Sequence, residues 1–143
     1  MAEKIVLELS REHARIVQDA CEMLMRLRLG QSSYAVELML GWPTHEDMDM
    51  KEYCMRRDTA NKVLEAFLHT VLGTNGCGYP DGRKDEMENL AYEVWGTIRH
   101  ELYLHDYPND KSYDVRAHEP LKESNYPMPK CRVVNVGEDG LPY

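Results

Sequence analysis

The sequence predicts a mainly helical, α+β fold: a bundle of three to four helices with a small β-sheet beside it. Apolar residues recur at three- and four-residue spacing over four stretches, which is the period of amphipathic helices. Short β-branched stretches lie near the start and in the final third, where five of the seven prolines fall. The length of 143 residues suits one core, so we expect a single domain, 1–143, with residues 106–143 as a Pro-rich extended segment.

The first expected elements are a strand and a long helix. Lys4–Leu9 begins with β-branched residues, so we expect a strand there, and Ser10 is a typical N-cap for the helix that follows. The apolar spacing predicts this helix from Arg11 to Leu29, and Gly30 would end it in a left-handed cap. Its expected apolar face comprises Ile16, Val17, Ala20, Met23, Leu24 and Leu27.

A second, short helix is expected over Tyr34–Leu40. Ser32 or Ser33 can cap its start, and Gly41 and Pro43 would end it.

The third helix has the clearest pattern in the chain and is expected over Met50–Leu72. Gly73–Arg83 holds four glycines and a proline, so it is expected to be a loop. The residues at core spacing in this helix are Ala60, Val63, Leu64, Phe67, Leu68, Val71 and Leu72.

A last helix and two short strands complete the expected fold. Asp85 and Glu88 resemble a capping box that starts a helix reaching about His105. Tyr113–Ala117 and Cys131–Val136 have the β-branched content of strands, which would pair with each other or with the first strand to form the small sheet.

Composition limits the classes of function. The formal net charge of -8 opposes direct binding of nucleic acid, because phosphate contacts need clustered Lys and Arg. No apolar run reaches the roughly 20 residues that span a bilayer, so no membrane association is expected. The first ten residues lack the pattern of a secretory signal, so a cytoplasmic protein with reduced cysteines is expected.

No motif for catalysis or metal binding is present. The two histidines of His100–His105 (HELYLH) are five apart, whereas a zinc protease needs two histidines four apart on one helical face. The glycine-rich loop has neither the P-loop pattern nor a dinucleotide-binding pattern, and no GxSxG occurs. We therefore expect no metal and no cofactor, and a non-enzymatic protein is favoured.

Polar residues that fall on the apolar faces of helices are the candidates for a site. A buried charge is costly unless it is paired, so such positions either pair internally or build a polar pocket. They lie near helix ends and comprise His13, Arg28, Gln31, Arg57, Asn61, Arg99, Glu101 and His105.

Two interpretations of these residues remain open. In the structural one, Glu101 pairs with Arg57 or Arg28, while the histidines face water. In the functional one, the helix ends converge on a pocket whose arginines hold an anionic or nucleotide-like ligand, because guanidinium offers a bidentate fork for phosphate.

Three short stretches carry a resemblance: LRLGQ (Leu27–Gln31), VWGTIRH (Val94–His100) and PMPK (Pro127–Lys130). Together they resemble small phage and prophage accessory proteins. No defined activity comes with this resemblance, but it implies a role in countering host defence, either by binding a protein or by sequestering a nucleotide signal, as oligomeric ligand sponges do.

Three functions follow as expectations. The first is a phage-type anti-defence protein, a homo-oligomer built through its helices that sequesters a nucleotide-derived signalling molecule in the host cytoplasm. The second is an acidic protein that occludes a host defence protein such as a nuclease. The third is a small hydrolase or transferase that uses His13, His105 or Glu101.

Overall fold

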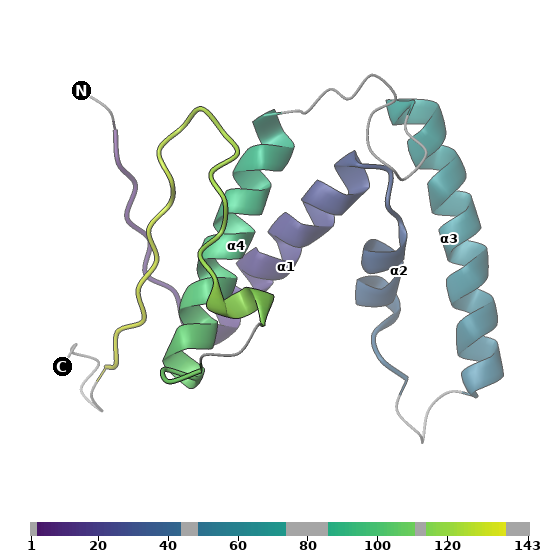
Figure 1. Ribbon diagram of the computed structural model, residues 1–143. Coiled ribbons are helices and arrows are strands. Elements are labelled where there is room, and N and C mark those ends of the chain that lie inside the picture. The colour runs from purple at the N-terminus through teal and green to yellow at the C-terminus, as the bar shows by residue number, and fades with distance from the viewer. Residues whose placement is uncertain (1–2, 44–48, 74–85, 111–113, 137–143) are drawn as a thin grey trace. The chain divides into compact units, whose positions relative to one another are not determined.

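The computed structural model describes residues 3–43, 49–73, 86–110 and 114–136. In this part of the chain there are four α-helices and one short 3-10 helix (Figure 1). The contacts divide the chain into two compact units. Unit 1 comprises residues 1–21 and 92–143, and unit 2 comprises residues 22–91.

Helix α1, Arg11–Arg28, begins and ends close to where the sequence predicts. At its start, the Ser10 hydroxyl accepts a hydrogen bond from the backbone N–H of His13 at 3.2 Å, which satisfies a donor that the first turn leaves without a partner. At its end, Gly30 has φ 78°, a left-handed conformation that glycine adopts without strain. Both predicted caps are therefore confirmed.

Unit 2 is built around two helices that pack against each other, α2 (Ser33–Leu40) and α3 (Met50–Leu72), as Figure 1 shows. The bounds of α3 are those predicted. The Asp49 carboxylate accepts the Lys51 N–H at 3.1 Å to cap its start, and Gly73 ends it at φ 66°. The apolar residues buried on these two helices are Ala35, Val36, Tyr53 and Leu68.

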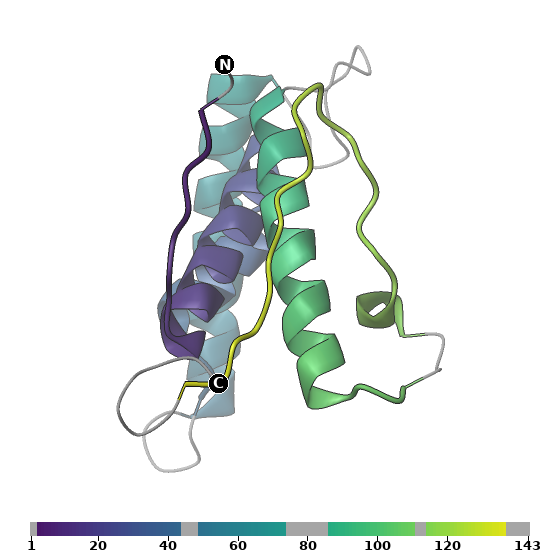
Figure 2. The same cartoon turned by 90° about the vertical axis from the view of Figure 1, so that its left-hand side faces the viewer.

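Helix α4, Glu86–Asp106, enters unit 1, where the chain returns along it. The returning part, residues 114–136, is called the tail, and it begins with the 3-10 helix η1, Val115–Ala117 (Figures 1 and 2). The tail approaches α4 closely: a Cβ atom on Gly96 would lie 2.7 Å from Cβ of Pro120. Trp95 and Tyr103 of α4 are buried in this unit.

The predicted β-sheet is wrong for the part of the chain that the structure describes. Lys4–Leu9 is extended but forms no strand, Val115–Ala117 is a 3-10 turn, and Cys131–Val136 carries no strand beyond an isolated bridge residue at its end. β-branched residues favour a strand only where a neighbouring strand pairs with them. The tail instead uses backbone N–H groups to bind side chains, as when Arg116 donates to the Asp114 carboxylate at 2.9 Å.

Several predicted core positions are also wrong. Helix α1 has no buried residue among those described, and Ile16 on it is 67% exposed. On α3, Leu68 is buried, but Val63 and Phe67 are 68% and 59% exposed. Helix α3 is apolar on two faces, and the spacing alone does not say which face its neighbour covers.

Two predictions fall outside the described residues. Asp85 of the expected capping box is one of them, although its partner Glu88 is described and buried. The glycine-rich loop is the other, apart from Gly73, which caps α3.

Candidate functional site

The residues that the sequence predicts for a site are divided between the two units. His13, Arg99, Glu101 and His105 lie in unit 1. Arg28, Gln31, Arg57 and Asn61 lie in unit 2.

In unit 1, the start of α1 meets the end of α4. Arg11 donates to the Asp106 carboxylate at 2.9 Å, and its second terminal nitrogen lies 2.9 Å from Nδ1 of His105. Because a guanidinium group only donates, Nδ1 of His105 accepts this bond, although it also lies 3.3 Å from Asp106. The hydrogen bond from Arg11 lowers the pKa of Asp106, so the group is an exposed ion pair with a histidine beside it.

His13 lies in the first turn of the same helix and forms a hydrogen bond with the N-cap. Its Nδ1 is 2.9 Å from the hydroxyl of Ser10. A serine and a histidine at this distance resemble a nucleophile and its base, but catalysis also needs a third group that orients the histidine. Among the described residues, His13 has no such contact, so the helix cap accounts for this pair.

Arg99 lies on the same helix as the two aromatic residues buried in unit 1. Its guanidinium carbon is 3.8 Å from the centre of the Trp95 ring, and that of Arg116 is 4.6 Å from the centre of the Tyr103 ring. Arg116 also donates to both oxygens of Asp114, at 3.0 and 2.6 Å. The side-chain and backbone hydrogen bonds from Arg116, aided by the charges of Arg116 and Arg99, lower the pKa of Asp114 to about 2.

Glu101 is half-buried on α4, and its charge acts on a nearby thiol. Burial, with a smaller contribution from Glu101, raises the pKa of Cys131, and burial raises the pKa of Cys21. Cys21, Cys54 and Cys131 form no disulfide within the residues that the structure describes. Raised pKa values leave little thiolate, so Cys21 and Cys131 are unsuited to nucleophilic chemistry.

In unit 2, the arginines among the predicted residues have acidic neighbours. Nε of Arg28 lies 3.7 Å from the buried carboxylate of Glu88. Arg57 lies 3.2 Å from Asp58, whose hydrogen bond raises the pKa of Arg57. The structural interpretation expected ion pairs here but named Glu101 as the acidic partner.

The two amides of unit 2 bind other side chains. The Gln31 side chain accepts a hydrogen bond from Arg26 at 3.2 Å, beside the cap of α1. The Asn61 side chain accepts one from the buried hydroxyl of Ser32 at 2.9 Å, which ties the start of α2 to α3. Both contacts are local to the packing of unit 2.

Sequence reasoning missed the most buried carboxylate that the structure describes. Glu93 on α4 is 1% exposed, and it accepts the backbone N–H groups of Glu123 and Ser124 at 2.8 and 2.6 Å and the Ser124 hydroxyl at 2.7 Å. Burial raises the pKa of Glu93, but these hydrogen bonds outweigh it and the net pKa is lowered. The only signal in the sequence is weak: Gly96, one turn later, marks a face of α4 that another segment approaches.

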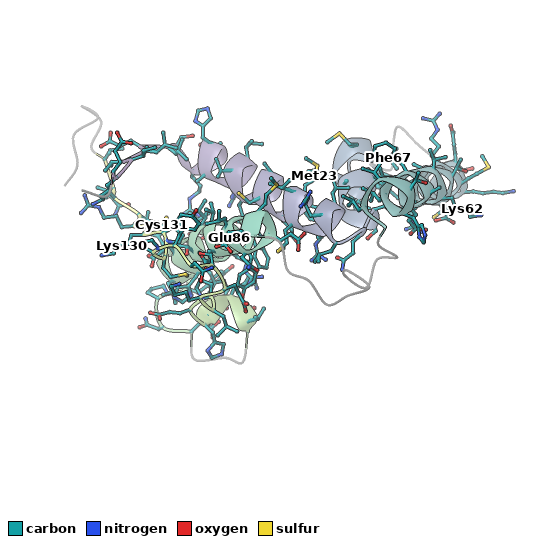
Figure 3. The ribbon with its side chains drawn as sticks, turned by 90° about the horizontal axis from the view of Figure 1, so that it is seen from above. Met23, Lys62, Phe67, Glu86, Lys130 and Cys131 are labelled. Carbon is teal, nitrogen blue, oxygen red and sulfur yellow. The ribbon has the colours of Figure 1, made fainter. Side chains whose placement is uncertain are left out.

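The second feature is an apolar stripe on α3, whose residues the sequence predicted to lie in the core. Val63, Phe67 and Val71 are spaced by four residues and are 59% to 68% exposed, and we call them the outer stripe of α3. Figure 3 shows that Phe67 and Lys62 leave the helix in different directions. The outer stripe therefore presents three large apolar side chains to solvent without a charged residue among them.

Within the described residues, no group of three or more His, Cys, Asp or Glu side chains is arranged to hold a metal ion. No helix in the same residues is long and apolar enough to cross a membrane. Comparisons of the chain with protein-family models, with curated proteins and with solved structures find no match.

Proposed function

We propose that this chain is a non-enzymatic binding protein that contacts a partner protein through the outer stripe of α3. The observation that supports this function is the exposure of Val63, Phe67 and Val71 on a helix whose other face already packs in unit 2. Contiguous apolar surface of this kind on a folded chain marks sites of association.

Covering the outer stripe would contribute a substantial free energy of association, but a stable complex needs a wider contact surface. Burying a large aliphatic or aromatic side chain stabilises a complex by roughly 1.5–3 kcal/mol. Association itself costs about 4–15 kcal/mol, so three such side chains offset only the lower end of that cost. Further apolar surface lies in the same unit, where Met39 and Trp42 are exposed at the end of α2. A stable complex would have to use both surfaces or add polar contacts around the stripe.

The net charge indicates the chemistry of the partner. With a formal charge of -8, the chain attracts a protein whose apolar contact surface is surrounded by basic residues. Enzymes that act on nucleic acid carry such basic surfaces. Together with the resemblance to phage accessory proteins, this favours a host defence protein such as a nuclease, which the chain would occlude.

The test replaces single stripe residues with glutamine, a good helix former. Phe67→Gln and Val63→Gln should abolish capture of the partner, while Ile16→Gln should not, because Ile16 has a similar exposure but lies on α1, outside the stripe. The measurement is co-purification with the basic partner from host cells, followed by titration of the two purified proteins at increasing salt. Equal capture by all three variants, or the absence of any captured protein, would contradict the proposal.

A second candidate function is the binding of a nucleotide-type anion at Arg99 and Arg116. The observation that favours it is the low pKa of Asp114, about 2, because the arginines that stabilise this carboxylate would stabilise a phosphate in the same way. Asp114 then competes with the ligand for the two arginines.

Asp114→Asn should increase the thermal stabilisation given by cyclic nucleotides or ADP-ribose derivatives, and Arg116→Gln should remove it. A panel of such compounds that leaves the melting temperature unchanged would exclude this candidate.

A further inference from the structure

The segment that precedes α1 is apolar, extended and uncovered. All residues from 3 to 10 are exposed, and Ile5, Val6 and Leu7 are 90%, 75% and 70% exposed. Within the described residues, no backbone hydrogen bond joins residues 3–9 to another segment. Ser10 ends the segment by capping α1, so its extended form stops at a defined residue.

A segment in this state is suited to pairing with a strand of another molecule. Its backbone N–H and C=O groups form no hydrogen bond with another described segment, and such groups along an extended segment can bond to an added strand. Three consecutive large apolar side chains in water are unfavourable, and a partner strand would cover part of their surface. That residues 3–9 form no strand with another described segment is therefore compatible with a strand formed between chains.

The charges of the segment favour a second copy of this chain as the molecule that supplies the partner strand. In an antiparallel pair with its two-fold axis at Val6, Lys4 of each copy lies opposite Glu8 of the other. The same register places Ile5 opposite Leu7 and Val6 opposite Val6, so apolar residues meet apolar residues.

Other registers lack this match. Shifting the two-fold axis by half a residue toward the start places Glu3 opposite Glu8, and shifting it by half a residue the other way places Glu8 opposite Ile5. A parallel, in-register pair places Lys4 on Lys4 and Glu8 on Glu8, and like charges opposite each other are destabilising.

We propose that two copies of this chain associate by antiparallel pairing of residues 4–8, with Lys4 and Glu8 forming two ion pairs across the two-fold axis. Two short strands alone form a marginal ribbon, so the dimer is reversible and depends on concentration. The outer stripe of α3 belongs to unit 2 and this segment to unit 1, so the pairing is independent of the proposed function.

The test is a charge exchange, read by sedimentation equilibrium over a range of concentrations. Lys4→Glu and Glu8→Lys each place like charges opposite each other at both ion pairs, so each variant alone should dissociate about tenfold or more readily than the wild type. An equimolar mixture of the two variants should associate again, and the double variant Lys4→Glu/Glu8→Lys should behave like the wild type. Both single variants lie outside the helices, so their circular dichroism should be unchanged.

Glu3→Lys is the matched control, because it changes the charge as Glu8→Lys does but lies opposite Leu9 in this register. It should leave the association close to that of the wild type. A wild-type chain that stays monomeric at the highest soluble concentration overturns the proposal. Equal association of the wild type and both single variants overturns it as well, because the dimer would then form through another surface.

Discussion

At the scale of single residues, Glu93 has the largest expected effect on stability. Its carboxylate extends from α4, is buried, and accepts three hydrogen bonds from the tail, at Glu123 and Ser124. A buried charge is tolerated only when it is satisfied in this way, and its removal leaves the donors of the tail without an acceptor.

We predict that Glu93→Ala lowers the free energy of unfolding by about 3 kcal/mol, whereas Glu93→Gln lowers it less because the amide oxygen still accepts the two backbone bonds. Urea denaturation of the three proteins measures both changes. If alanine and glutamine were equivalent to the wild type, the hydrogen bonds to the tail would not contribute to stability.

The lowered pKa of Glu93 also predicts a dependence on pH. Its pKa in the folded chain is below the ordinary value of 4.5, so the unfolded chain takes up the proton first as the pH falls. The stabilisation from Glu93 is therefore complete above about pH 4.5 and is lost as the pH falls through the folded pKa. The difference in unfolding free energy between the wild type and Glu93→Gln should shrink from pH 7 toward pH 3, and a constant difference would show that this carboxylate does not titrate with folding.

At the scale of elements, the docking of the tail on α4 depends on a glycine. Replacing a helical glycine by alanine usually stabilises a helix by about 1 kcal/mol. At Gly96 the added Cβ would lie 2.7 Å from Cβ of Pro120, closer than real contacts allow, so the tail or the helix must move.

We predict that Gly96→Ala destabilises the chain and exposes the tail to limited proteolysis. The same substitution made in a Pro120→Gly background should be neutral or stabilising, because the opposing Cβ atom is gone. This double-mutant cycle separates the clash from the helix propensity. Equal effects of Gly96→Ala in both backgrounds would mean that the contact with Pro120 is not limiting.

At the scale of the whole molecule, the net charge leads us to predict no binding of DNA, and this prediction does not depend on the arrangement of the two units. The formal charge of -8 repels phosphate backbones, and only clustered basic residues overcome this. We predict no change in the fluorescence anisotropy of a short labelled DNA duplex at a salt concentration of about 0.15 M. Binding that weakens steeply with added salt would contradict this and would require a basic patch on the surface.

The sequence by itself determined the elements whose signals are local. The extent of α3 agrees with its apolar spacing, and the caps of α1 at Ser10 and Gly30 are where residue type predicts them. Caps and turns depend on a few neighbouring residues, so one sequence suffices to locate them. Arg28 and His105 lie near the ends of α1 and α4 as predicted, whereas Asn61 lies in the middle of α3, and the partners of these residues were not predicted.

Only the tertiary structure decided which faces are covered and which polar groups meet. It leaves the outer stripe of α3 in solvent, joins Arg11 to Asp106 across most of the chain, and assigns the tail to Glu93 rather than to a sheet. Such contacts join residues far apart in sequence, and their free energy depends on burial and hydrogen bonding that no local pattern encodes. The physical reason is the same in each case: spacing defines a helix, but the segment that packs against it defines its buried face.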